Sequence, residues 1–400
     1  SDVCSSDLGD GSEGRYDGES MFKNGIVSLT VNYRLGVFGA LAHPELSKES
    51  IHRVSGNYGL MDQSAALHWV KDNIAAFGGD PDKVTIAGES AGSVSVSAQM
   101  VSPLSKHLIA GAIGESGSLL GALPPIPLAD AEKNGLAFQQ FAAAASLTAL
   151  RNLTADSILN MSVRYGSFRF PYSVDGYFFP KDPMEIFKSG EQAQVPLLVG
   201  WNSEEMNYRM LLGNDALTRE NYARAVRKVY GPRADDVLNA YVATTDAEVE
   251  QAATDLAGDR FIGFSTWRWA TLHAATGTKP VYRYYYMRPR PEMIIEKGAA
   301  QPPRAKGAVH SAEIEYGMGN LHYNKVYAWS EEDNKVSRTL QGYFVNFIKG
   351  GDPNGNGLPP WPALSNKESA AVMYIDVESK AGPEKFPARY PLLEQLNAGH

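Results

Sequence analysis

Apolar positions gather in two kinds of stretch along the chain, and together these predict alternating strands and helices. Short apolar runs that contain β-branched residues and end at glycine, proline or polar residues are typical of buried strands. Such runs lie at 24–32, 84–87, 109–116, 195–200, 281–287 and 371–375. Apolar residues recur at helical spacing over 59–77, and helices are also expected near 130–145, through much of 216–275 and over 331–349.

The order of these elements predicts a sheet that is mostly parallel. The helix at 59–77 ends at the Gly-Gly-Asp-Pro stretch of residues 78–81, and the strand at 84–87 follows at once. A strand, a helix and a second strand in this order form a crossover between parallel strands. Long excursions such as 119–190 leave from carboxyl ends of strands, where open α/β sheets bind ligands. We therefore expect an α/β protein with helices on both faces of the sheet and helical insertions that wall a pocket.

Composition narrows the classes of partner. The 400 residues are 44% apolar and 20% charged, as in soluble globular proteins. A formal net charge of −8 argues against nucleic acid or an anionic membrane surface as a partner. The sequence has no apolar run of about 18 residues, so we expect no transmembrane segment. The single cysteine, Cys4, excludes an internal disulfide and a cysteine-based metal site.

The first eight residues differ from the rest of the chain. The stretch SDVCSSDL at 1–8 has neither apolar periodicity nor a signal-peptide pattern. We interpret it as a non-native tail joined to a truncated reading frame, the alternative being a natural disordered terminus. On this interpretation residues 9–400 form a single domain. The location of the protein is left open, with secretion or the periplasm favoured over the cytoplasm.

The clearest candidate chemistry lies at 84–93. Here Gly88 and Gly92 bracket Ser90 between a strand and a helix, which is the G-x-S-x-G pattern of a nucleophile elbow. So sharp a turn strains the serine backbone and exposes its hydroxyl at the start of the helix. The N–H of Ala91 is then free to face a developing oxyanion. The alternative is a serine that only caps a helix in a glycine-rich turn.

A serine nucleophile needs a base and a carboxylate that orients the base. On this architecture the chain order is serine, acid, histidine. Glu204 and Glu205 follow the strand at 195–200, where the acid is expected, and position alone leaves both of them open. They could also be two solvated loop acids. Of the eight histidines, His310 lies in a loop after the last major strand, as the order requires, although a structural histidine is the usual alternative.

Several longer stretches resemble the type-B carboxylesterases, the cholinesterase-like branch of the α/β-hydrolases. They run almost from end to end of the chain and in the family's order. The stretches are VNYRLGVFG at 31–39, GNYGLMDQ at 56–63, NIAAFGGDP at 73–81, GESAG at 88–92, VPLLVG at 195–200, the G-x-x-H-x-x-E-I setting of His310, GDPNG at 351–355 and WP at 361–362. The resemblance implies an α/β-hydrolase fold and a serine hydrolase that cleaves small-molecule carboxylic esters without a metal or cofactor.

The same resemblance implies a role for each candidate residue. Ser90 would be the nucleophile, Glu205 the acid and His310 the base. Ala91 would supply one oxyanion N–H, and Ser116 would lie near the triad within reach of Glu205. The rival readings are a cholinesterase-like binding protein that has lost catalysis, and an amidase or peptidase on the same fold.

The chain also departs from the family pattern. Glu115 stands where glutamine is more usual, and Met206 stands where glycine is more usual. The family's His-Gly-Gly-Gly stretch, which supplies further oxyanion donors, would precede Gly9 and is absent from this sequence. The strand that leads into it would lie between the strands at 26–32 and 84–87. We therefore expect the chain as written to be weakly active or inactive and poorly stable.

Overall fold

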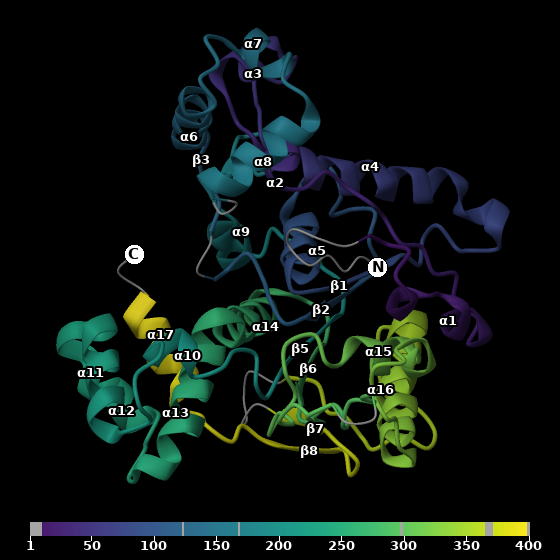
Figure 1. Ribbon diagram of the computed structural model, residues 1–400. Helices are drawn as coiled ribbons and strands as arrows, with labels where there is room; N and C mark the ends of the chain where they lie inside the picture. The colour runs from purple at the N-terminus through teal and green to yellow at the C-terminus, as the bar shows by residue number, and fades with distance from the viewer. Residues whose placement is uncertain (1–9, 122–123, 167–168, 297–298, 365–370, 398–400) are drawn as a thin grey trace.

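A six-stranded sheet forms the centre of the protein (Figure 1). The computed structural model describes residues 10–121, 124–166, 169–296, 299–364 and 371–397. In spatial order the strands are β1 (Thr85–Glu89), β2 (Gly111–Glu115), β5 (Leu197–Asn202), β6 (Val281–Tyr286), β7 (Ala371–Ile375) and β8 (Lys380–Pro383). The strands from β1 to β7 run parallel, and β8 pairs antiparallel with β7. The prediction of a mostly parallel sheet is confirmed.

Helices cover both faces of this sheet, and the two faces have separate cores. One core contains helices α5 (Ala91–Val101), α9 (Pro183–Ser189) and α14 (Phe264–Thr276), with Leu197 and Val199 of β5 turned toward them. Leu198, between those two, faces the other core with α15 (Ile314–Met318) and α16 (Glu331–Gly350). In Figure 1, α14 and α16 lie on opposite sides of the strands. The alternation follows from the two-residue period of a strand, and continuous apolar runs result because both faces are buried.

Helix α16 shows how the sequence fixes a covering helix. Ser330 and Asp333 form a reciprocal capping box at its start, and Gly351 ends it with φ of 73°. Each such cap stabilises a helix by about 1 kcal/mol. Its buried face recurs at helical spacing and consists of Val336, Leu340, Tyr343, Phe344 and Phe347. The helix therefore packs one apolar stripe on the sheet and leaves the opposite side to solvent.

The remaining helices lie before the sheet or in insertions. Those before β1 are α1 (Glu19–Lys23), α2 (Gly36–Ala40), α3 (Pro44–Glu49) and α4 (Tyr58–Asn73). The insertion after β2 contains a small sheet of β3 (Ile126–Pro127) and β4 (Ser173–Val174), with α6 (Leu128–Phe141), α7 (Leu147–Arg151) and α8 (Ala155–Tyr165). The insertion after β5 contains α10 (Arg209–Leu212), α11 (Arg219–Tyr230), α12 (Ala234–Ala240) and α13 (Asp246–Gly258), and α17 (Arg389–Asn397) packs beside α14. Both insertions leave from carboxyl ends of strands, as the sequence predicts.

One predicted strand was wrong. Residues 24–32 were expected to form a strand, but the structure gives them no regular element after α1. A strand exists only when its backbone groups pair with a neighbour. No described strand pairs with this segment, and among the described strands β1 pairs with β2 alone.

No helix among the described residues is both long enough and apolar enough to cross a lipid bilayer.

Candidate active site

Ser90 occupies a strained turn between β1 and α5. Its φ of 54° and ψ of −116° are unusual for a residue with a side chain and cost about 1–3 kcal/mol. The turn is fixed on both sides, because Ser90 N donates to Glu115 O at 2.8 Å and a Cβ at Gly117 would lie 2.9 Å from Ser90 O. The strain turns the Ser90 hydroxyl toward the loops that follow β5 and β6.

A hydrogen-bonded chain links Ser90 to His310 and Glu205. The distance from His310 Nε2 to Ser90 Oγ is 2.9 Å, and that from His310 Nδ1 to Glu205 Oε2 is 2.5 Å. Ser90 directly follows β1, Glu205 lies just after β5, and His310 lies far along the loop that follows β6. The structure thus brings together all three residues that the sequence singles out.

A backbone bridge decides which of the two adjacent glutamates meets His310. Glu204 pairs with Val309 in an isolated parallel bridge, and Glu204 N donates to Ala308 O at 2.8 Å. The bridge joins the loop after β5 to the loop after β6. Because successive side chains of an extended segment point in opposite directions, the next residue, Glu205, turns inward toward His310. Glu205 is 3% exposed, whereas Glu204 is half-buried.

The Glu205 carboxylate is held by two further donors. Ser116 Oγ donates to Glu205 Oε1 at 2.5 Å, and Asn202 N donates to the same oxygen at 2.6 Å. Ser116 follows β2 directly and has φ of 56°. The structure therefore places Ser116 beside the acid, within the reach that the sequence implied.

Comparison with known proteins shows the family to which the chain belongs. The sequence matches the model of the Carboxylesterase family over residues 5–390. The chain belongs to the carboxylesterase family. It is 32% identical over 388 residues to an acylcarnitine hydrolase of Mus musculus, covering 92% of this chain and 66% of that protein. It is 31% identical over 403 residues to a fumonisin B1 esterase of Sphingopyxis macrogoltabida, covering 95% and 70%.

The solved structures similar to this carboxylesterase-family chain include a PNB esterase. The TM-score is 0.77 at 28% sequence identity, covering 98% of this chain and 80% of that one. The fold is therefore the α/β-hydrolase fold that the sequence predicts. The chain spans 63–66% of the length of three similar curated relatives, namely the acylcarnitine hydrolase, carboxylesterase 1C and pyrethroid hydrolase Ces2e.

Three further acids surround the triad of this carboxylesterase-family site, and sequence reasoning gave none of them a role. Glu89 Oε1 lies 3.3 Å from His310 Nε2, and Asn202 Nδ2 donates to Glu313 Oε2 at 2.5 Å. Glu115 lies opposite Glu89 in the register of β2 with β1. Burial raises the pKa of Glu89 to about 8 and that of Glu313 to about 7, and it raises the pKa of Glu115 well above its ordinary value.

The sequence carried faint signals for these acids. Glu89 is the residue before Ser90 in the elbow, and Glu313 follows His310 in the G-x-x-H-x-x-E-I pattern. Only the folded chain shows that both are buried against the histidine.

Burial and the neighbouring carboxylates have opposite effects on the pKa of His310. Burial lowers its pKa, but the carboxylates of Glu205, Glu89 and Glu313 outweigh burial and raise the pKa of His310 to about 10. The ring of Phe261 meets the imidazole edge to face, with centroids 5.3 Å apart. The acids therefore favour the imidazolium, which is the charged form that appears when this ring accepts a proton.

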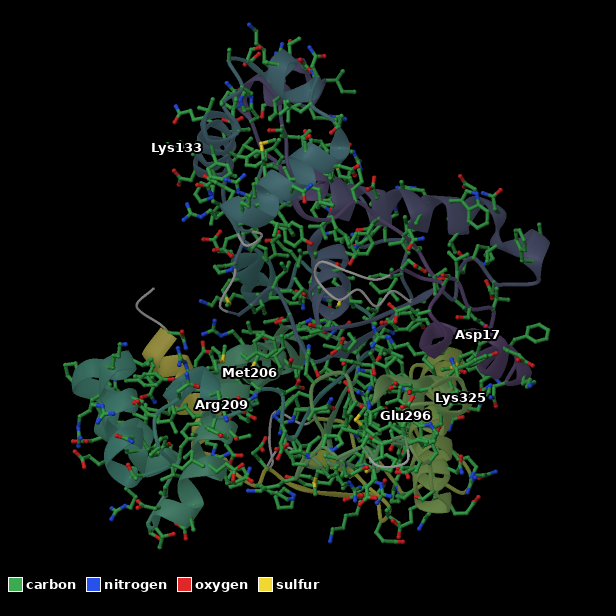
Figure 2. All side chains as sticks on the ribbon, viewed as in Figure 1. Asp17, Lys133, Met206, Arg209, Glu296 and Lys325 are labelled. Atoms are coloured by element: carbon green, nitrogen blue, oxygen red, sulfur yellow. The ribbon has the colours of Figure 1, made fainter. Side chains whose placement is uncertain are left out.

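Ala91 is the first residue of α5, so its N–H has no carbonyl within the helix to bond. Met206 is half-buried in the loop after β5, and Figure 2 shows it close to Arg209 at the start of the helical insertion. With methionine at this position the loop still brings the Glu205 carboxylate to His310. Among the described residues, no group of three or more histidine, cysteine, aspartate and glutamate side chains is arranged to hold a metal ion.

Proposed function

We propose that the protein hydrolyses carboxylic esters of small molecules through an acyl-enzyme intermediate on Ser90. The observation that carries the proposal is the unbroken chain of short contacts from Ser90 through His310 to Glu205. Family membership supports the ester as substrate class, because the named relatives include esterases and ester-cleaving hydrolases.

The first half of the proposed reaction forms the acyl-enzyme. Ser90 Oγ attacks the ester carbonyl carbon while its proton passes to His310 Nε2. The Glu205 carboxylate accepts from Nδ1–H and stabilises the resulting imidazolium. The N–H of Ala91 donates to the oxyanion of the tetrahedral intermediate. When the intermediate collapses, the C–O bond to the alcohol breaks and His310 returns the proton to the leaving oxygen.

The second half releases the acid. Water takes the place of the alcohol, loses a proton to His310 Nε2 and attacks the acyl carbon. The second tetrahedral intermediate then breaks its bond to Ser90 Oγ, which regains its proton from His310. Ester and water give alcohol and carboxylic acid, and the protein is unchanged.

Covalent labelling tests the nucleophile without requiring fast turnover. The protein is treated with a fluorophosphonate probe, and the labelled peptide is identified by mass spectrometry. We expect one label, on Ser90, and none in Ser90→Ala. Labelling of another serine, or equal labelling of Ser90→Ala, would overturn the assignment. A panel of p-nitrophenyl esters beside the matching p-nitroanilides then tests the substrate class, since faster release from the anilides would contradict the ester proposal.

A further inference from the structure

The backbone that carries His310 is held on both sides of the imidazole. His310 lies near the end of the loop that follows β6 and leads into α15. Before His310, Asn202 Nδ2 donates to Val309 O at 2.9 Å. After His310, Arg290 Nη2 donates to Ser311 O at 2.9 Å. The imidazole therefore extends from a three-residue segment whose first and last carbonyls are both bonded.

The bond from Arg290 holds a backbone in a rare conformation. Ser311 has φ of 61°, in the left-handed region that residues with a Cβ seldom adopt. Such a conformation persists only where the surroundings fix it. Because a change in φ turns the carbonyl of the same residue, the bond from Arg290 to Ser311 O opposes relaxation. Since Ser311 directly follows His310, its relaxation would also redirect the backbone that carries the imidazole.

Arg290 is itself held in place by several contacts. The same nitrogen, Nη2, lies 2.8 Å from Glu315 Oε2, and the guanidinium carbon lies 5.4 Å from the centroid of the Tyr327 ring. Arg304 Nε donates to Arg290 O at 2.9 Å. Burial lowers the pKa of Arg290, but the Glu315 carboxylate outweighs burial and raises it above its ordinary value. The bond to Ser311 O is thus charge-assisted and comes from a fixed donor.

We propose that Arg290 is a positioning residue for the hydrolysis, and that its bond to Ser311 O sets the orientation of His310 between Ser90 and Glu205. The inference rests on the proposed function, because it takes His310 as the base. The contacts of His310 with these two residues measure 2.9 Å and 2.5 Å and leave little room for rotation. A misplacement of about 1 Å lowers the rate of such a reaction by about 100-fold.

The alternative is that Arg290 only stabilises the packing of α15 through its ion pair with Glu315. Both interpretations predict that removal of Arg290 lowers the stability of the fold, so Tm alone does not separate them. Glu315→Gln does separate them, because it removes the ion pair and leaves the donor to Ser311 O. Arg290→Met and Arg290→Lys form a second matched pair, because both have a straight apolar stem and they differ in the charged donor.

The first test measures the orientation of His310 without turnover, in the whole chain labelled with ¹⁵N-histidine. The readout is the exchange rate of the imidazole Nδ1–H proton that bonds to Glu205, assigned by its absence in His310→Ala. We expect Arg290→Met to speed this exchange by about tenfold or more, and Glu315→Gln to leave it within about threefold. The imidazole proton that buried His273 shares with a backbone carbonyl should be unchanged and serves as the internal control.

Turnover of a p-nitrophenyl ester gives the second readout. We expect Arg290→Met to lower kcat by about 10- to 100-fold with KM almost unchanged, because a misplaced base slows the reaction and not the binding. Arg290→Lys should recover part of the loss, because an ammonium can still donate to Ser311 O. Glu315→Gln should keep kcat within about threefold.

Four results would overturn the proposal: unchanged proton exchange in Arg290→Met, an equal effect in Glu315→Gln, a change in KM alone, or no protected Nδ1–H in the unsubstituted chain. If Arg290→Met does not fold, Arg290→Met/Glu315→Gln leaves no unpaired charge and is compared with Glu315→Gln. If the phosphonate probe fails to label Ser90, the proposed hydrolysis is wrong, and the proton exchange still shows whether Arg290 orients His310.

Discussion

The two halves of the candidate site rest on different kinds of strand. His310 and Glu205 follow β6 and β5, which are paired with neighbours on both sides. Ser90 follows β1, which among the described strands pairs with β2 alone and borders a cavity. The acid lies close to a fully paired strand, and the bridge from Glu204 to Val309 ties the His310 loop to it, whereas the nucleophile depends on its elbow and on the ladder between β1 and β2. The comparison teaches that the acid–base pair and the nucleophile are positioned by separate contacts.

Breaking the acid–base half should have the largest effect. Glu205→Gln removes the charge that stabilises the imidazolium and should lower kcat by about 10⁴-fold, measured with a p-nitrophenyl ester. Glu204→Gln is the matched control, because the backbone of Glu204 forms the bridge and its side chain does not touch His310. Its kcat should stay within about twofold. Equal losses in the two variants would contradict the assignment of Glu205.

Stability should change next, at the buried carboxyl of Glu115 in β2. Because burial raises the pKa of Glu115 in the folded protein, its stabilising protonated form is favoured below the unfolded pKa near 4.5 and is lost as pH rises through the folded pKa. Glu115→Gln removes that dependence and should raise the free energy of unfolding by about 1–3 kcal/mol at pH 8, with little change at pH 4. Urea unfolding at the two pH values measures this difference. A larger gain at pH 4 than at pH 8 would refute it.

Loss of one donor to the acid should have a smaller effect. Ser116→Ala removes the hydroxyl that donates to Glu205 Oε1 and leaves Asn202 N in place. We expect kcat to fall by about tenfold with KM almost unchanged, as removal of one charge-assisted hydrogen bond gives. Ser116→Thr, which keeps the hydroxyl, should recover part of the loss. A change in KM alone would show that Ser116 acts on substrate binding instead.

The smallest effect should be a displacement of the pH profile. Activity requires neutral His310, so kcat/KM should rise with pH, and the raised pKa of His310 places that rise above the range of an ordinary histidine. Glu89→Gln removes one negative neighbour and should move the rise to lower pH by less than about one unit, because burial keeps much of Glu89 protonated near neutrality. A shift to higher pH would have the wrong sign for a carboxylate beside the ring.

The sequence predicted those features whose signals are local. The elbow at Ser90 is a five-residue pattern. β2, β5 and β6 are short apolar runs, as expected for strands that are buried on both faces of the sheet. These features are determined by residues that are neighbours in the sequence, so the sequence alone predicts them.

Features that depend on distant partners could not be predicted in this way. The run at 24–32 has the composition of a strand, but no strand among the described residues pairs with it. Glu204 and Glu205 could not be separated by position, because a bridge to Val309 across more than one hundred residues decides which one faces His310. Glu89 and Glu313 look like ordinary surface acids until the fold buries them.

The bridge between Glu204 and Val309 has a consequence for how this scaffold can vary. It joins two loops whose functional side chains, Glu205 and His310, are 105 positions apart in the sequence. The helices α10 to α13, which lie between these two loops, can vary in length while the bridge preserves the spacing of acid and base, whereas β6 and α14 belong to the sheet and its core. An exchange of α10 to α13 among relatives is therefore best joined after Glu205 and before α14, so that the bridge and the acid–base pair are kept.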